Sequence, residues 1–186
     1  MNIGFALCGS FCTYDAVFPV IEELAKMHTI IPILSPASAT TDTRFGCARE
    51  HTEWLTKICG RTPLTTLTDV EPIGPKRMLD ILVIAPCTGN TLAKLAHGIA
   101  DTSVTMAAKS HLRNGRPVLI GISSNDALAG GAENLGRLLN RKHYYFVPFG
   151  QDDPFGKPCS MVAKFEKLPQ ALRAATEGYQ IQPMLI

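Results

Sequence analysis

The chain has 186 residues, of which 46% are hydrophobic and 18% are charged, and its formal net charge at pH 7 is +2. This length suits one well-buried domain spanning residues 1–186, and the small charge, without a cluster of Lys and Arg, argues against a nucleic-acid-binding protein. No stretch approaches the ~20 apolar residues of a membrane-spanning helix, and the apolar N-terminus lacks the basic segment of a signal peptide.

The six cysteines contain no C-x-x-C pair and form no cluster with histidines at metal-ligand spacing. A chain of this size buries a full core without disulfides, and reduced cysteines are typical of cytoplasmic proteins. We therefore expect a cytoplasmic protein without a zinc site.

The first part of the chain predicts two strands separated by a helix. Residues 2–8 form an apolar strand, and a loop over 8–13 follows it. Apolar residues then recur on one helical face at Val17, Val20, Ile21, Leu24 and Ala25. Pro19 stands near the start of this helix, where a missing N–H costs least. Residues 29–34 predict the second strand, with 35–38 as its exit loop.

The next segment carries weaker signals. Residues 43–59 predict a helix that holds the only tryptophan, Trp54, and on a helix this residue is more often a core or oligomer contact than a platform for a ligand. Residues 62–67 predict a short third strand. The segment 70–76 contains two prolines and one glycine and predicts a loop or a short broken helix.

The stretch from Asp80 to Asp101, DILVIAPCTGNTLAKLAHGIAD, is the most informative. Residues 81–84 are apolar on both faces, as in a strand of a parallel sheet that is covered by helices. We expect Pro86 to end this strand, CTGNT to form a polar turn, and a helix to run through Leu92, Leu95, Ala96 and Ile99. A strand, a turn with a glycine and a helix N-terminus together predict a site for an anionic or heteroaromatic ligand.

Two glycines complicate the region that follows. Residues 103–112 predict a helix and 117–122 a strand, after which the capping residues of 123–126 precede a helical apolar pattern up to Leu139. Gly130 and Gly131 lie inside that pattern and would cost about 2 kcal/mol relative to alanine. Either a neighbour approaches the backbone closely there, as in a pocket wall, or the helix begins only after Gly131.

The C-terminal part predicts a strand over 143–149, a polar loop over 150–160 and a helix from about 160 to 175. In the loop, Asp152 and Asp153 are candidates for a general base and Lys157 for a carboxylate clamp. Acidic residues before a proline are also common turn formers, so this simpler interpretation stays open.

Strands that alternate with helices at these intervals predict an α/β fold with a doubly wound, mostly parallel sheet. Loops that follow parallel strands gather at one edge, so the ends of the strands at 2–8, 29–34, 81–84 and 117–122 should converge. After the first strand, Ser10 and Thr13 form either an anion site or part of a plain tight turn. No G-x-G-x-x-G follows this strand, which argues against a chain that itself binds NAD.

The motif PCTGNT at 86–91, followed by GIAD at 98–101, resembles the flavoprotein family of cysteine decarboxylases and flavin prenyltransferases, which carries P-A-S-A-N-T and G-x-A-D on the same strand, turn and helix. The resemblance implies a flavodoxin-like three-layer fold, homo-oligomers that are trimers or multiples of trimers, and FMN as a possible cofactor. It places the cofactor-binding positions at Gly9, Ser10, Thr13, Ser35, Pro86, Thr88, Asn90, Thr91 and Asp101.

Longer stretches resemble the B-subunit family of the dipicolinate synthases of endospore-forming bacteria. They include ALCGSFCTYD near the N-terminus, and above all SSNDALAGGAENL and VPFGQDDPFGKPCSMVA, where the decarboxylases differ. This resemblance implies formation of pyridine-2,6-dicarboxylate from a dihydrodipicolinate-type precursor. It also implies an A-subunit partner that binds NAD(P), and a location in the mother cell of a sporulating bacterium.

Three departures from the decarboxylase pattern stand out. Residues 70–79 contain no histidine, SSNDAL at 123–128 stands in place of P-x-M-N-x-x-M-W, and Gly89 stands where the family motif has alanine. These differences argue against cysteine-dependent oxidative decarboxylation.

Three hypotheses follow. In the first, the chain is an oxidoreductase subunit that is weak or inactive without its partner: Ser10 and Thr13 hold a phosphate or carboxylate, Asn90 bonds a ring or carboxylate, and Lys157 clamps the second carboxylate of a small dicarboxylate. Its catalytic candidates are Asn90, Asp153 and Lys157. The second is a stand-alone FMN-dependent decarboxylase or flavin prenyltransferase, and the third is a non-catalytic scaffold that binds a ligand.

Overall fold

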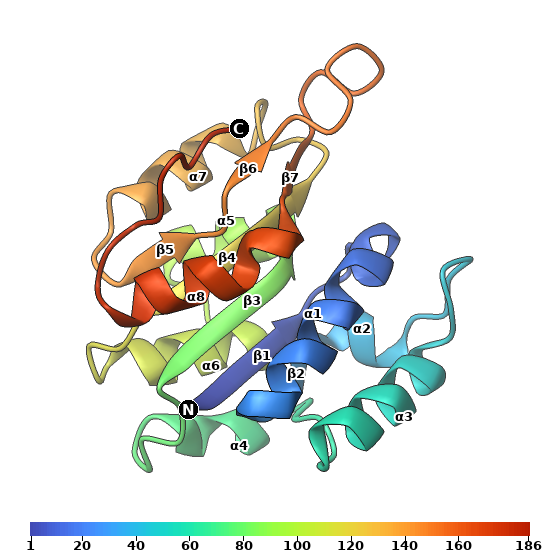
Figure 1. Ribbon diagram of the computed structural model, residues 1–186, viewed down its shortest axis with the longest axis vertical. Helices are drawn as coiled ribbons and strands as arrows, with labels where there is room; N and C mark the ends of the chain where they lie inside the picture. The colour runs from blue at the N-terminus through green and yellow to red at the C-terminus, as the bar shows by residue number, and fades with distance from the viewer.

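In a computed structural model, which describes residues 1–186, the chain folds around one seven-stranded sheet (Figure 1). The strand order is β2-β1-β3-β4-β7-β6, and β5 also pairs with β4. The strands are β1 (Asn2–Leu7), β2 (Thr29–Leu34), β3 (Ile81–Cys87), β4 (Val118–Ser124), β5 (Tyr144–Phe146), β6 (Phe149–Gly150) and β7 (Met161–Ala163). The pairs among β1 to β5 are parallel, whereas β7 is antiparallel to β4 and β6. The predicted α/β, mostly parallel fold is confirmed.

Helices cover both faces of this sheet. They are α1 (Tyr14–Met27), α2 (Pro36–Thr40), α3 (Ala48–Cys59), α4 (Leu67–Val70), α5 (Gly89–His97), α6 (Ser103–Leu112), α7 (Ala132–Leu139) and α8 (Leu168–Thr176), with 3-10 turns η1 (Phe11–Thr13), η2 (Glu71–Ile73) and η3 (Phe165–Lys167). Helices α1 and α8 lie on one face and α5, α6 and α7 on the other (Figure 1). No helix is both long and apolar enough to cross a membrane.

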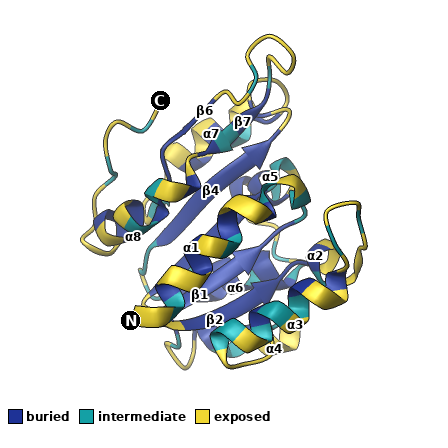
Figure 2. Ribbon diagram, turned by 45° about the vertical axis from the view of Figure 1, so that its right-hand side comes forward, coloured by how far each residue is buried: buried dark blue, intermediate teal, exposed yellow.

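The core lies between these layers. Every residue of β3 and β4 is buried, as expected for central parallel strands that are covered on both sides. Figure 2 shows the buried strands between helices whose outer faces are exposed. Trp54 is half-buried and stacks on Phe18 with ring centroids 4.4 Å apart. This contact agrees with the prediction that Trp54 has a packing role.

Parallel pairing brings the carboxyl ends of the central strands to one edge. Leu7 of β1 pairs with Leu34 of β2, and Cys87 of β3 pairs with Ile122 of β4. The segments that leave β1, β3 and β4 therefore start side by side, as the sequence predicts for this edge of the sheet.

Several predicted boundaries are wrong in the first half of the chain. Residues 35–38 are not an open loop, because Ser35 caps the short helix α2 and Pro36 occupies its first turn. The strand predicted at 62–67 shrinks to a single bridge between Ile33 and Leu64. Helix α3 begins at Ala48 instead of residue 43, and Pro19 lies inside α1 beyond its first turn.

The central unit differs from its prediction at both ends. Pro86 does not end β3 but lies within it, at an irregularity in the pairing with β4 between Ile84 and Cys87. A proline is tolerated in such a place because no ladder N–H is required of it. Ile99 lies outside α5, since Gly98 adopts a left-handed φ of 72° and ends the helix there.

In the C-terminal third, pairing between strands that are distant in sequence determines where the elements begin and end. Ser123 and Ser124 are the last residues of β4 rather than helix caps, and α7 starts after Gly131, as one of the two open alternatives predicted. The predicted strand 143–149 is divided into β5 and β6. The helix predicted from 160 begins as α8 only at Leu168, because Met161–Ala163 pairs with the end of β4 and with β6.

Candidate functional site

A cavity of about 540 Å³ opens at the carboxyl edge of β1, β3 and β4. Four segments that are distant in sequence build it: the loop after β1, the first turn of α5, the end of β4 with its following turn, and the loop between β6 and β7. The lining residues are Ser10, Cys12, Thr88, Gly89, Asn90, Ser123, Ser124, Asn125, Asp126, Asp152, Lys157, Ser160 and Val162. Polar side chains dominate this list, which favours a small hydrophilic ligand.

The N-terminus of α5 forms the floor of this cavity. Thr88 is the N-cap, and its hydroxyl oxygen accepts a hydrogen bond from the Thr91 backbone N–H at 3.2 Å. Thr91 in turn donates its hydroxyl to the Cys8 sulfur at 3.3 Å, which ties α5 to the end of β1. The first N–H groups of a helix have no carbonyl partner within it, so Gly89 and Asn90 present donors and a positive dipole end to a ligand.

The loop after β1 is fixed to the end of β4. Ser10 donates its hydroxyl to the Ser123 carbonyl oxygen at 2.7 Å, and Thr13 donates its hydroxyl to the Ser10 carbonyl oxygen at 2.8 Å. The Ser10 hydroxyl oxygen can still accept a hydrogen bond from a ligand at the cavity wall. Thr13 is turned back into its own loop, so its contribution is to hold Ser10 in place.

Gly89 meets two side chains from the end of β4. A Cβ atom at this position would lie 2.7 Å from both the Asp126 Oδ1 atom and the Ser124 Oγ atom. Ser124 donates its hydroxyl to the same Asp126 oxygen. The glycine that replaces the family's alanine therefore makes room for a carboxylate directly beside the start of α5.

The loop from 151 to 160 supplies the only cation of the cavity. It extends beyond the body of the molecule in Figure 1, and Lys157 Nζ lies 3.2 Å from Asp152 Oδ2. Burial acts to raise the pKa of Asp152, but hydrogen bonds from Ser160 and Lys157 outweigh it and hold that pKa below its usual value. Asp152 and Lys157 therefore form an ion pair at the cavity wall.

The sequence-predicted site residues fall into two groups. Ser10, Thr88, Asn90, Asp152 and Lys157 line the cavity together. Residues that do not line it are Gly9, Thr13, Ser35, Pro86, Thr91, Asp101 and Asp153.

Most members of this second group are engaged in local structure. Ser35 is buried as the cap of α2, and Asp101 pairs with Lys94 at 2.8 Å. The Asp153 carboxylate accepts the Gly156 backbone N–H at 2.8 Å, which is the turn-forming role that the sequence left open.

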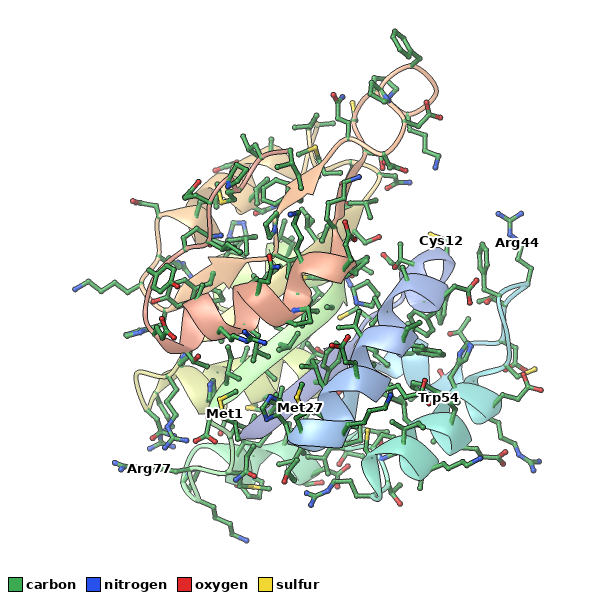
Figure 3. All side chains as sticks on the ribbon, viewed as in Figure 1. Met1, Cys12, Met27, Arg44, Trp54 and Arg77 are labelled. Atoms are coloured by element: carbon green, nitrogen blue, oxygen red, sulfur yellow. The ribbon has the colours of Figure 1, made fainter.

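Sequence reasoning missed Cys12, Asp126, Ser160 and Val162 as cavity residues. Cys12 lies in the turn η1 before α1, on the same side of the molecule as the projecting 151–160 loop (Figure 3). Asp126 comes two residues after the end of β4, at the carboxyl edge of the sheet, and this position after a predicted strand was the signal that could have identified it. The Ser-Ser-Asn-Asp pattern instead suggested helix caps. Gly131 likewise packs against the Asp126 carbonyl oxygen and not against a pocket.

The two buried cysteines near the cavity are not suited to nucleophilic chemistry. Burial raises the pKa of the Cys8 thiol to about 11 and raises the pKa of the Cys87 thiol well above its usual value. Since the thiolate is the reactive form, both residues stay protonated at neutral pH. No group of three or more His, Cys, Asp or Glu side chains is arranged to hold a metal ion.

FMN requires a site for a tricyclic apolar ring as well as for a phosphate. Only Cys12 and Val162 among the cavity residues are hydrophobic, so one chain offers no apolar plane for the ring. The residues of a single chain therefore do not fit a whole FMN, and they fit a smaller ligand better.

Comparison with known proteins places this geometry in a family. The Flavoprotein family model matches residues 1–143. The B subunit of dipicolinate synthase from Bacillus subtilis is 50% identical over 189 aligned residues, which cover 100% of this chain and 93% of the relative. The crystal structure of the dipicolinate synthase B subunit from Bacillus halodurans superposes with a TM-score of 0.91 at 45% identity, over 100% of this chain and 95% of that one.

A more distant solved structure shows the common fold. An FMN-dependent cysteine decarboxylase matches with a TM-score of 0.69 and 24% identity, over 94% of this chain and 97% of that chain. The Flavoprotein model ends before the 151–160 loop, whereas the two dipicolinate synthase relatives extend across it. The segment that carries Asp152 and Lys157 therefore belongs to the part shared with the nearer relatives.

Proposed function

This chain belongs to the Flavoprotein family, and within that family we propose that it acts as the B subunit of a dipicolinate synthase. The identity of 50% over the whole chain to a protein of that name carries the proposal. In this role the chain works with an A subunit that binds NAD(P), and the complex forms pyridine-2,6-dicarboxylate from a dihydrodipicolinate-type precursor. We place it in the cytoplasm of the mother cell during sporulation.

The chemistry of the cavity supports a dicarboxylate ligand. A planar dicarboxylate needs two sites that are rich in cations or N–H groups, and the cavity offers the N-terminus of α5 and the Lys157 ammonium group. Asn90 can bond a carboxylate or the ring nitrogen from the first turn of α5. Ser10 and Thr88 add hydroxyl groups for the remaining oxygens. Lys157 exchanges its contact with Asp152 for a substrate carboxylate in this proposal.

The partner is required because this chain lacks the usual NAD fingerprint. NAD(P)⁺ is the hydride acceptor of the reaction and comes with the A subunit. The present chain then binds the dihydropyridine, orients its ring and receives the proton that the oxidation releases. We also propose that the chain forms a homo-oligomer, a trimer or a multiple of trimers, which a mass measurement by light scattering tests.

The direct test is reconstitution. The purified chain, the A subunit, NAD(P)⁺ and freshly generated dihydrodipicolinate should give dipicolinate, detected by its ultraviolet absorbance, together with NAD(P)H. Either protein alone should give little or none. Absence of dipicolinate from the complete mixture, with both proteins folded, contradicts the proposed function.

Variants of two cavity residues separate a catalytic role from a scaffold role. Asn90→Ala and Lys157→Met should each raise KM or lower turnover by about tenfold or more, since each removes a hydrogen bond to a charged group. Lys57→Met on the exposed side of α3 is the matched control and should behave as wild type. Unchanged turnover in both cavity variants would favour the non-catalytic scaffold role.

The PCTGNT and GIAD motifs favour a second candidate, a stand-alone FMN enzyme of the decarboxylase or prenyltransferase type. Titration of the isolated chain with FMN distinguishes it, because a bound flavin loses much of its fluorescence. From the polar cavity we expect no saturable quenching. Quenching that saturates at one FMN per chain would restore this candidate.

A further inference from the structure

Three aspartates lie in or beside the cavity, and two of them are already engaged. Asp152 is paired with Lys157 at 3.2 Å, and the Asp153 carboxylate caps the Gly156 N–H at 2.8 Å outside the cavity lining. The Asp126 carboxylate has no cationic partner, and the one hydrogen bond that it accepts comes from the Ser124 hydroxyl. Asp126 is therefore the aspartate of the cavity that is held neither by a cation nor by a backbone N–H group.

The surroundings hold Asp126 in a fixed position. Its backbone carbonyl oxygen accepts hydrogen bonds from the N–H groups of Ala129 at 2.9 Å and Gly131 at 3.0 Å, which closes the turn after β4. Its carboxylate packs against Gly89, where the missing Cβ leaves the necessary room. The side chain thus lies beside Asn90 and the first turn of α5, where the proposed substrate binds.

We propose that Asp126 is the general base that accepts the ring proton when the dihydropyridine dicarboxylate is oxidised, and that Ser124 is its positioning residue. This assignment rests on the proposed function. Oxidation of a dihydropyridine to a pyridine removes one hydride and one proton. The hydride leaves ring carbon with its electron pair and goes to NAD(P)⁺ on the partner protein.

The second C–H bond breaks at the neighbouring ring carbon. Its electron pair becomes a π bond of the aromatic ring, and its proton goes to an Asp126 carboxylate oxygen. The side chain is exposed, so the proton passes on to water and the carboxylate is regenerated. The products are dipicolinate, NAD(P)H and one proton, which balances atoms and charge.

The division of roles follows from the charges. A base next to a dicarboxylate repels its substrate unless cationic or N–H-rich groups compensate the charges of the two carboxylates. Lys157 and the N-terminus of α5 supply such groups, while Asp126 stands between the end of β4 and the first turn of α5. Removal of the Asp126 charge should therefore leave the binding of dipicolinate intact or tighten it while turnover collapses.

The test uses the reconstituted complex of both full-length proteins with Asp126→Asn. Loss of a general base typically costs 10²–10⁴-fold in rate, so kcat should fall by about that factor while KM changes by less than about threefold. D126E should recover part of the rate.

Matched variants and a binding measurement complete the test. D15N makes the same change on the exposed first turn of α1 and should keep wild-type rates. Calorimetry of the isolated D126N chain with dipicolinate should show affinity equal to or above wild type. Ser124→Ala should lower kcat less than D126N and should leave KM unchanged, because it removes the contact that positions the base.

Each contrary result points to a different error. An active wild-type complex together with a D126N complex within threefold of it overturns the assignment alone, as does a loss of dipicolinate binding in D126N. Collapse of turnover in D153N with D126N unaffected also overturns it and returns the base to Asp153. A wild-type complex that forms no dipicolinate overturns the proposed function and the assignment together.

Discussion

At the scale of single residues, Gly89 links the fold to the proposed chemistry. Its position at the start of α5 faces the Asp126 carboxylate and the Ser124 hydroxyl, and a methyl group there would lie 2.7 Å from both. An alanine at this position, as in the flavoprotein motif, must push the flexible carboxylate away. The glycine thus couples the end of β4 to the N-terminus of α5.

We therefore expect Gly89→Ala to separate stability from activity. Alanine favours a helix over glycine by about 0.5–1 kcal/mol, which offsets the local clash, so the free energy of unfolding should change by less than about 1 kcal/mol. Turnover of the reconstituted complex should fall by tenfold or more, because Asp126 is displaced. Denaturant unfolding and steady-state kinetics on the same preparations check both expectations.

Gly136→Ala provides the matched control for this prediction. Gly136 lies within α7, and an added Cβ atom meets nothing within 4 Å. The helix preference of alanine over glycine should raise the free energy of unfolding there without any change in turnover. Equal turnover of G89A and wild type would show that the contact between Gly89 and Asp126 has no functional weight.

Residue types alone could predict only part of this site. Ser10, Thr88, Asn90 and Lys157 follow from the motif and from the loop composition, and they do line the cavity. The sequence could not distinguish Asp126 as a cavity residue from Asp126 as a helix cap. The distinction requires knowing that Ser123 and Ser124 belong to β4. Ser35 and Asp101 looked available in the sequence, yet Ser35 caps α2 and Asp101 binds Lys94.

At the scale of elements, the short helix α2 is held to β1 by a buried hydroxyl network. Ser38 donates its hydroxyl to the Leu7 carbonyl oxygen at 3.0 Å and accepts from the Tyr14 hydroxyl at 2.9 Å. The Ser35 hydroxyl oxygen lies 2.9 Å from the Ser38 hydroxyl oxygen. A five-residue helix has little stability of its own, so these contacts anchor it to the sheet.

Ser38→Ala should destabilise the chain by about 1–3 kcal/mol, since it leaves buried polar groups without partners. For a protein of this size the melting temperature should fall by roughly 2–4 °C per kcal/mol. Thr40→Ala, which removes an exposed hydroxyl from the same helix, should change stability by less than about 0.5 kcal/mol. Equal melting temperatures for S38A and T40A would mean that the network does not anchor α2.

Helix α6 carries a buried titratable group. His111 is 1% exposed, and its Nε2 atom lies 3.0 Å from the Pro117 carbonyl oxygen at the entry to β4. The pKa of His111 is lowered to about 4, chiefly by burial and to a smaller extent by the nearby Arg116 charge, while the hydrogen bond to Pro117 opposes this shift. The imidazole is therefore neutral in the folded chain at pH 7 and donates the Nε2 proton to the carbonyl.

This burial predicts a dependence of stability on pH. An unfolded histidine has a pKa of about 6.5, so between pH 6.5 and 4 the unfolded chain binds more protons than the folded one. The contribution of His111 is complete above pH 6.5 and is lost as the pH falls toward 4, by up to about 3 kcal/mol.

Equilibrium unfolding of wild type and His111→Gln from pH 7.5 to 4.5 checks this expectation. The difference in unfolding free energy between the two proteins should shrink as the pH falls. A difference that stays constant across this range would contradict the burial of a neutral imidazole.

At the scale of elements the sequence was informative wherever structure is local. The strands β1 and β2 and the helix α6 agree closely with their periodic patterns, because apolar spacing within a segment determines them. The segment 161–163 could not be recognised as a strand, since its pairing partners lie at Ser123–Ser124 and Phe149–Gly150. In this segment, pairing with strands that are distant in sequence determines the structure, although the local pattern favours a helix.

At the scale of the whole molecule, the cavity joins parts of the chain that are far apart in sequence. Its walls come from the loop after β1, the start of α5, the end of β4 and the 151–160 loop. The strand order brings the loop after β1, the start of α5 and the end of β4 to one edge of the sheet. The 151–160 loop lies at the same edge because β7, which follows it, pairs antiparallel with the end of β4. A ligand that contacts all four segments must stabilise the folded chain as a unit.

Dipicolinate should therefore raise the melting temperature of the isolated chain. A ligand at 100 times its Kd contributes about 2.7 kcal/mol, which corresponds to roughly 5–10 °C for a chain of this length. Picolinate, which has only one carboxylate, should give a smaller shift because it cannot engage Lys157 and the α5 N-terminus together. Lys157→Met should reduce the dipicolinate shift toward that of picolinate, and Lys57→Met should not. Since dipicolinate chelates divalent cations, the scans are compared with an equal concentration of EDTA, and equal shifts for both pyridine acids would refute two-point recognition in this cavity.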